Sequence, residues 1–90
     1  MSNKTVLFSS KERVSPEHVS QFLRMLADQL QENRVSFRRD GEDVSLNVPG
    51  EMVLEIKAEE KTKKYGIKRS IEIELKWREG EEQRGGVSVE

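Results

Sequence analysis

The chain has no cysteine, and this absence excludes several kinds of site at once. Without a thiol there is no disulfide, iron–sulfur cluster, cysteine nucleophile or cysteine zinc site. The sequence also holds a single histidine, His18, which has no partner histidine or cysteine with which to hold a metal ion. We therefore expect a protein that uses no cofactor and no metal.

Long apolar runs are also missing. No stretch approaches the roughly 18 residues that suggest a membrane-spanning helix. The first fifteen residues hold too short an apolar segment for a signal peptide. Sixteen basic residues nearly balance seventeen acidic ones, so the chain as a whole has no field that attracts nucleic acid or anionic membranes. The expected setting is the cytoplasm, without a membrane partner.

The clearest pattern is that of an amphipathic helix over residues 15–33. Ser15 is a good N-cap, and Pro16 follows at the first helical position, where its missing N–H is harmless. Asn33 suits the left-handed residue that ends a helix. The apolar residues fall at helical spacing and form one stripe. They are Val19, Phe22, Leu23, Leu26, Ala27 and Leu30.

After the helix the period of the apolar residues changes from 3.6 to 2, which predicts strands. Residues 34–39 and 42–48 flank Asp40-Gly41, a dipeptide suited to a two-residue type I′ turn. With that loop, Phe37 faces Val44 and the apolar side continues across both strands.

Two further strands are predicted at residues 51–60 and 70–77. In each of these strands the apolar residues occupy alternate positions, so the face on which they lie is fixed. The register is not fixed, because a loop centred on Lys64-Tyr65 and one centred on Tyr65-Gly66 both keep the apolar residues on the same face. Residues 5–14 are read as an additional first strand. We expect this strand to pair antiparallel with the last one, and a parallel position beside residues 35–39 is the alternative.

These elements predict an α+β fold: an antiparallel sheet of about five strands, in the order βαββββ, with one amphipathic helix on one face. Residues 1–79 are expected to form a single domain, and residues 80–90 a disordered charged tail. Trp77 extends the apolar row of the last strand and is assigned to the core. The predicted core residues are Phe22, Leu23, Leu26, Leu30, Phe37, Leu46, Leu54, Ile56, Ile71, Ile73, Leu75 and Trp77.

The segments SPEHVSQFLRMLADQL, VSLNVP, MVLEIKAE and SIEIELKW resemble the amphi-Trp domain family of small prokaryotic domains. The resemblance covers residues 4–79. Its most specific residues here are Ser15, Glu17, Leu23, Arg24, Leu26, Ala27, Asp28, Leu30 and Trp77. Departures from the family pattern occur in the first helical turns, at Pro16, His18, Val19 and Ser20, and all fit a helix. The family has no established activity or ligand, so the resemblance implies a fold and no site.

The strongest candidate for a contact site is a basic segment around the last turn. It comprises Lys61, Lys63, Lys64, Tyr65, Lys68 and Arg69, and residues 61–69 hold no acidic residue. Lysines can bind phosphates, and an aromatic ring beside them can stack on a base. Lysines near a turn also have a purely structural use, because they protect strand edges from pairing with other chains.

No catalytic constellation is present, so we expect a non-enzymatic interaction module. It would bind itself or another protein through a sheet edge or a sheet face. Weak nucleic-acid binding through residues 61–69 is the alternative.

Overall fold

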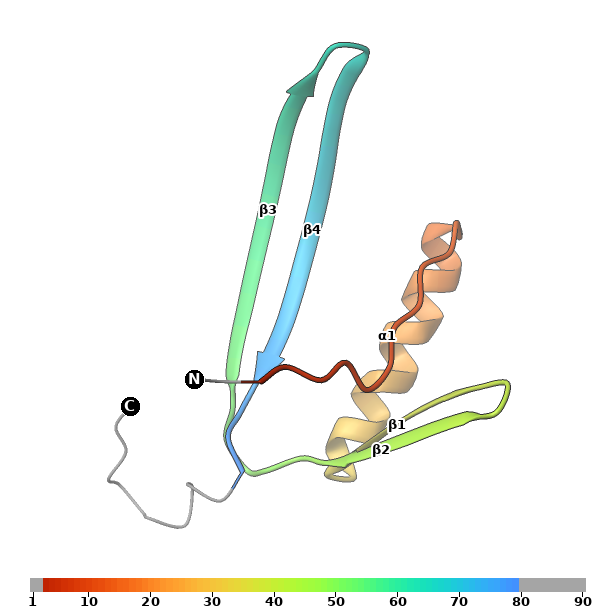
Figure 1. Ribbon diagram of the computed structural model, residues 1–90, viewed down its shortest axis with the longest axis vertical. Coiled ribbons are helices and arrows are strands. Elements are labelled where there is room, and N and C mark those ends of the chain that lie inside the picture. The colour runs from red at the N-terminus through yellow and green to blue at the C-terminus, as the bar shows by residue number, and fades with distance from the viewer. Residues whose placement is uncertain (1–2, 80–90) are drawn as a thin grey trace. The chain divides into compact units, whose positions relative to one another are not determined.

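The computed structural model describes residues 3–79. One helix, α1 (Pro16–Gln31), precedes four strands: β1 (Arg34–Arg39), β2 (Glu42–Asn47), β3 (Val53–Lys63) and β4 (Gly66–Lys76). The strands form two antiparallel hairpins, β1–β2 and β3–β4 (Figure 1). The chain divides after Gly50 into two compact units, one with α1, β1 and β2 and the other with β3 and β4.

The α+β class with antiparallel strands is confirmed, but two details of the prediction are wrong. Over residues 3–79 the chain has four strands rather than five, and they form two two-stranded sheets rather than a single one. The missing strand is the one predicted at residues 5–14.

Helix α1 begins and ends as the sequence predicts. The Ser15 hydroxyl accepts a hydrogen bond of 3.1 Å from the backbone N–H of His18, which satisfies one of the free donors of the first turn. At the other end, Asn33 adopts φ 62° and donates its backbone N–H to Leu30 O. This left-handed residue turns the chain directly into β1.

Strands β1 and β2 pair in the predicted register, with Val35 opposite Leu46 and Phe37 opposite Val44. The loop is Asp40-Gly41, as expected, but it is not a type I′ turn. That turn needs positive φ at both loop residues. Gly41 has φ 74°, whereas Asp40 has no positive φ. The pairing therefore follows from the apolar alternation together with the two-residue loop length, and does not need that turn type.

Residues 3–15 form no strand, so the predicted first strand and its pairing with the last strand are wrong. Side chains attach this segment to β1 instead. Phe8 stacks on Phe37 with 5.2 Å between ring centroids, and Arg39 Nη2 donates to Ser9 O over 2.6 Å. The segment thus lies beside β1, the alternative location, but side-chain contacts rather than backbone pairing hold it there.

Helix α1 packs against β1, and the Gln29 side chain accepts a 3.0 Å hydrogen bond from the Ser36 backbone N–H at the open edge of that strand. Val35 is the buried apolar residue of the described chain, with 5% of its surface exposed. The stability of such a small unit therefore depends strongly on this one buried side chain.

Burial of the twelve predicted core residues is uneven. Six are partly buried: Leu26, Leu30, Phe37, Leu46, Leu75 and Trp77. The other six are exposed: Phe22, Leu23, Leu54, Ile56, Ile71 and Ile73. The exposed strand residues belong to the β3–β4 hairpin, in which two strands alone cannot cover an apolar face. Their role as core residues therefore stays a prediction.

No helix within residues 3–79 is long and apolar enough to cross a membrane. The predicted charged tail, residues 80–90, lies outside the described residues.

Removing the helix cap by Ser15→Ala is expected to lower the free energy of unfolding by about 1 kcal/mol. The reason is the loss of the hydrogen bond to the backbone N–H of His18. In a domain of this size the melting temperature should fall by about 4–8 °C. The control is Ser20→Ala inside the same helix, which should leave the melting temperature unchanged or raise it slightly. Equal effects of both substitutions would contradict the assigned cap.

Candidate functional site

The β3–β4 hairpin carries the residues that the sequence suggested as a contact site. Its eleven cross-strand pairs run from Val53 opposite Lys76 to Lys63 opposite Gly66, so Lys64-Tyr65 is the two-residue loop. This decides between the two registers that the sequence left open. Gly66 has φ 143°, a conformation that glycine adopts far more easily than other residues.

The hairpin divides the basic segment between its two faces, because alternate residues of a strand point to opposite sides. Lys61 and Lys68 lie directly opposite each other on one face, and Lys63 shares that face. Arg69 lies on the other face, where its Nε donates to Glu60 Oε1 over 3.0 Å. The sequence therefore grouped residues that the fold separates. Three lysines remain together, and Arg69 belongs to an ion pair.

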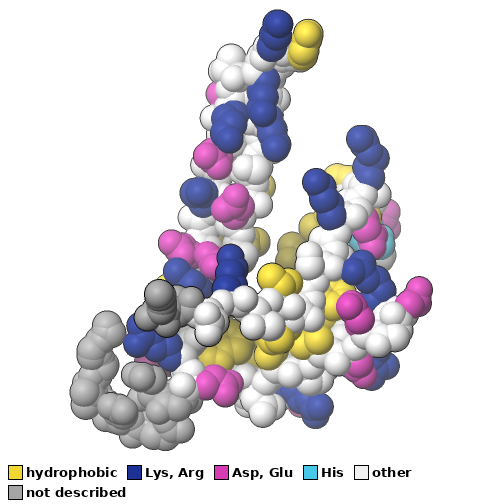
Figure 2. All heavy atoms as spheres, viewed as in Figure 1, with side chains coloured by type: hydrophobic (Ala, Val, Ile, Leu, Met, Phe, Trp, Pro, Cys, Tyr) yellow, Lys and Arg dark blue, Asp and Glu magenta, His cyan; other side chains and the backbone are white. Residues whose placement is uncertain are grey.

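The tip of the hairpin exposes an aromatic ring. Tyr65 is 92% exposed, and Lys64 Nζ lies 5.8 Å from the centre of its ring, within the range of a cation–π contact. On the face that Figure 2 shows, lysine and arginine side chains gather towards the turn, and acidic side chains become frequent farther from it. The tip can thus offer positive charge and one stacking surface.

We define the polar face of the hairpin as the face that carries Glu55, Lys57, Glu72 and Lys76. Its charges pair with one another across the strands: Lys76 Nζ lies 2.9 Å from Glu55 Oε1, and Lys57 Nζ lies 3.8 Å from Glu72 Oε1. The hydrogen bond and charge of Lys76 lower the pKa of Glu55, and Glu55 raises the pKa of Lys76 in return. A carboxylate held ionised in this way is a poor general acid.

This coupling predicts a result for Lys76→Met. The pKa of Glu55 should rise towards its ordinary value of 4.5, because the first cause of its lowering is removed. Carboxyl NMR titration measures the change. Lys57→Met is the matched control and should move the pKa of Glu55 much less, since Lys57 is the smallest cause. Equal shifts in both variants would contradict the assignment.

The same pair gives the hairpin a pH dependence of known sign. The pKa of Glu55 is lowered on folding, so the pair stabilises the hairpin above pH 4.5 and loses this contribution as the pH falls below it. The pKa of Lys76 is raised, so its contribution is complete below pH 10.5 and is lost at higher pH.

We define the apolar face of the hairpin by three cross-strand pairs: Leu54 with Leu75, Ile56 with Ile73 and Ala58 with Ile71. Four of its large side chains are more than half exposed: Leu54 57%, Ile56 64%, Ile71 76% and Ile73 56%. At the end nearer the turn, the pair Glu60–Arg69 continues the same face. A regular apolar row with this much exposure is unusual on the surface of a globular protein.

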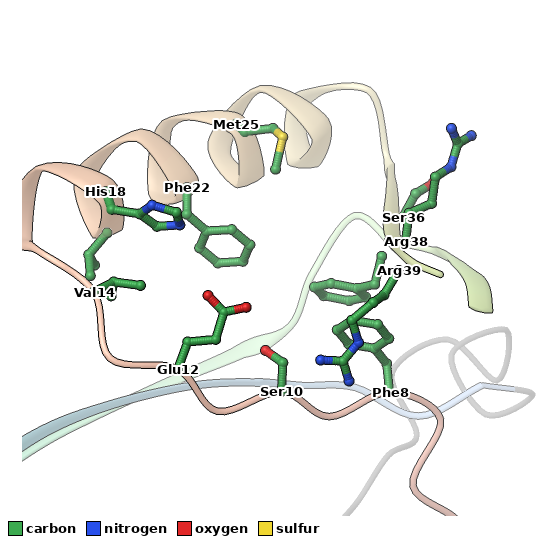
Figure 3. Close-up of a pocket in the computed structure, with 12 residues that line it drawn as sticks. Phe8, Ser10, Glu12, Val14, His18, Phe22, Met25, Ser36, Arg38 and Arg39 are labelled. Atoms are coloured by element: carbon green, nitrogen blue, oxygen red, sulfur yellow. The ribbon is translucent and has the colours of Figure 1, made fainter. Parts of the chain in front are cut away.

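The unit with α1 has an open groove of about 390 Å³ between residues 8–14, the helix and β1. Figure 3 shows Glu12 and Ser10 pointing from the N-terminal segment towards His18 and Phe22 of the helix. The Arg39 guanidinium lies 5.2 Å from the centre of the Phe8 ring. The groove combines aromatic walls with both signs of charge, so it selects no single class of ligand. Across residues 3–79 no cluster of metal-ligating side chains occurs.

The comparison with known families adds the deciding observation. The Amphi-Trp domain model matches residues 1–90. The chain belongs to the Amphi-Trp domain family. This confirms the resemblance seen in the helix and in the strand before Trp77. No curated protein and no solved structure matches the chain.

Membership of the Amphi-Trp family assigns no function to any residue, so the site must be judged on geometry. Sequence reasoning predicted the basic segment as a contact site and assigned the residues of the apolar face to a core, because alternation of this kind is typical of a core strand. It missed the contact of Phe8 with Phe37. Trp77 follows directly on β4 and is partly buried.

Proposed function

We propose that this Amphi-Trp domain is a non-enzymatic interaction module that binds a protein partner through the apolar face of the β3–β4 hairpin. The observation that carries the proposal is the exposure of Leu54, Ile56, Ile71 and Ile73 in one fully paired hairpin. Isolated two-stranded hairpins are marginally stable at best in water. A hairpin with eleven residues in each strand gains stability when a partner covers its apolar face.

The polar face supports a structural rather than a catalytic role for the hairpin. Its carboxylates at Glu55 and Glu72 pair with lysines of the neighbouring strand. Such cross-strand pairs hold the register and keep that side in water. The polar face of the hairpin thus suits contact with water, and the apolar face suits contact with a protein.

The test is site-specific photo-crosslinking in the native cells, with the crosslinking amino acid placed at Ile73 or at Glu72. These neighbouring positions point to opposite faces of β4. The proposal expects a covalent protein adduct from position 73 and little or none from position 72. Adding Ile56→Asp to the position 73 variant should remove the adduct, since Ile56 lies directly opposite Ile73. Adducts of equal yield from both positions, or none from position 73, would reject the apolar face as the binding surface.

Weak nucleic-acid binding is the second candidate, and one observation favours it. Lys61 and Lys68 lie directly opposite each other, although like charges in that position destabilise a hairpin. A phosphate between them would relieve this repulsion. Against it, the shallow hollow beside these lysines is also lined by Glu59 and Glu72, whose charges repel phosphate. We therefore rank this function below protein binding.

A salt titration with single-stranded oligonucleotides tests the second candidate. The double variant Lys61→Gln/Lys68→Gln should weaken binding and flatten its salt dependence. The control Lys57→Gln/Lys76→Gln removes the same charge from the same face, away from the turn, and should change binding less. Absence of binding by the wild type at low salt would dismiss this candidate.

A further inference from the structure

Resting on the proposed function, we propose that the partner is a second copy of this chain. The two β3–β4 hairpins stack apolar face to apolar face and point in the same direction. A two-fold axis runs between them, parallel to the strands. In this arrangement β3 of one copy lies over β4 of the other, and sheets packed in this way lie roughly 10 Å apart with their strands nearly aligned.

The cross-strand pairs of the apolar face make this arrangement self-complementary. A two-fold interface places residue i of one copy against residue j of the other, and j against i. With β3 over β4, each residue meets across the interface the same residue type that it faces within its own hairpin. Ala58 therefore meets Ile71, so that a small side chain receives a large one on both sides of the axis. Ile56 meets Ile73, and Leu54 meets Leu75.

Charge complementarity fixes the direction of stacking. Glu60 and Arg69 form the ion pair that continues the apolar face towards the turn. With both hairpins pointing the same way, Glu60 of each copy meets Arg69 of the other. The two ion pairs join into a ring of four alternating charges. Arg69, which can present two donors to a carboxylate, suits such a shared position.

The opposite direction of stacking fits less well. If the turn of one hairpin lay over the open end of the other, the Glu60–Arg69 pair would meet Leu54 or Ile56. This would place two charges against apolar side chains, and poorly compensated charges are costly to bury. Sliding the hairpins until the ion pairs met each other would leave Leu54 and Leu75 uncovered.

The lysines near the turn also suit this dimer. Lys61, Lys63 and Lys68 lie on the polar side of the hairpin, which becomes the outer surface of each copy. Their charges therefore point away from the partner.

The experiment exchanges the charges of the ion pair in the full chain and measures mass in solution by sedimentation and native mass spectrometry. The wild type should be a dimer of two 10.4 kDa copies in the micromolar range. Glu60→Arg alone and Arg69→Glu alone should each weaken dimerisation at least about tenfold, because like charges then meet across the interface. Mixing the two variants should restore a dimer with one copy of each. The doubly exchanged variant Glu60→Arg/Arg69→Glu should dimerise like the wild type.

Recovery of the dimer on mixing would show that the ion pair acts between copies. Within each single variant positions 60 and 69 still carry like charges, so mixing cannot restore the ion pair inside one hairpin. A wild type that stays monomeric, or single variants that do not recover on mixing, would overturn the proposal. An adduct from position 73 whose mass differs from two copies would overturn the dimer and leave the binding function standing. No adduct from that position would reject both.

Discussion

Replacing Val35 by aspartate is expected to unfold the unit that contains α1, β1 and β2. Val35 is 5% exposed and is the buried apolar residue of the described chain. An unpaired charge at a buried position costs about 3–5 kcal/mol. Small domains have a total stability of about 5–15 kcal/mol, and this unit, with so little buried, lies near the low end. Far-UV circular dichroism should show the loss of the helical signal, since α1 is the helix of residues 3–79.

The matched control is Val53→Asp. Val53 is also a valine in a strand, but it is 58% exposed and lies on the polar side of the hairpin opposite Lys76. This substitution should change stability by less than about 1 kcal/mol. If Val35→Asp kept the helical signal and the melting temperature of the wild type, Val35 would not be the residue on which the unit depends.

The first hairpin shows how much of the fold local sequence determines. The pairing of β1 with β2 follows from the alternation around Asp40-Gly41, and every predicted pair is present. A slip of one residue would put the apolar residues of one strand on the other side. Among the registers that keep Val35, Phe37, Val44 and Leu46 together, the two-residue loop at Asp40-Gly41 selects the observed one. The turn type did not follow, because several backbone conformations close a two-residue loop.

The N-terminal segment shows where local sequence fails. Val6 and Phe8 have the spacing of a strand, but Ser9, Ser10 and the charged residues after them have no apolar alternation. What positions the segment is a ring stacked on Phe37 and a carbonyl bonded to Arg39. Contacts between residues about thirty positions apart leave no periodic signal.

The candidate site could be predicted only in part for a related reason. Composition drew attention to residues 61–69 because they are basic, but strand parity separates Arg69 from Lys68. Arg69 has the same parity as Ile71 and Ile73, so the sequence already implied that it lies on the apolar face. Whether the apolar face is part of a core or a contact surface depends on what covers it. The pattern of residues within one strand does not identify the covering element.

The second large effect is expected for Ile73→Asp, in which a charge replaces a central side chain of the apolar face. Ile73 is 56% exposed in the hairpin, and under the proposed binding mode it becomes buried against a partner. Loss of that buried isoleucine removes about 1.5–3 kcal/mol, and the new charge opposes association further. Since an uncovered two-stranded hairpin is marginal, β3 and β4 should lose about a hundredfold in protection of their amides from hydrogen exchange.

The amides of β1 and β2 should keep their protection in Ile73→Asp, because the two hairpins belong to separate compact units. Glu74→Asp is the control: it introduces the same residue one position away, on the opposite side of β4, and should leave exchange nearly unchanged. An unchanged exchange rate in Ile73→Asp would mean that the hairpin does not need its apolar face covered. Loss of protection in β1 and β2 as well would mean that the two units unfold together. The expected pattern, confined to β3 and β4, would show that contact through the apolar face and folding of this hairpin are one process.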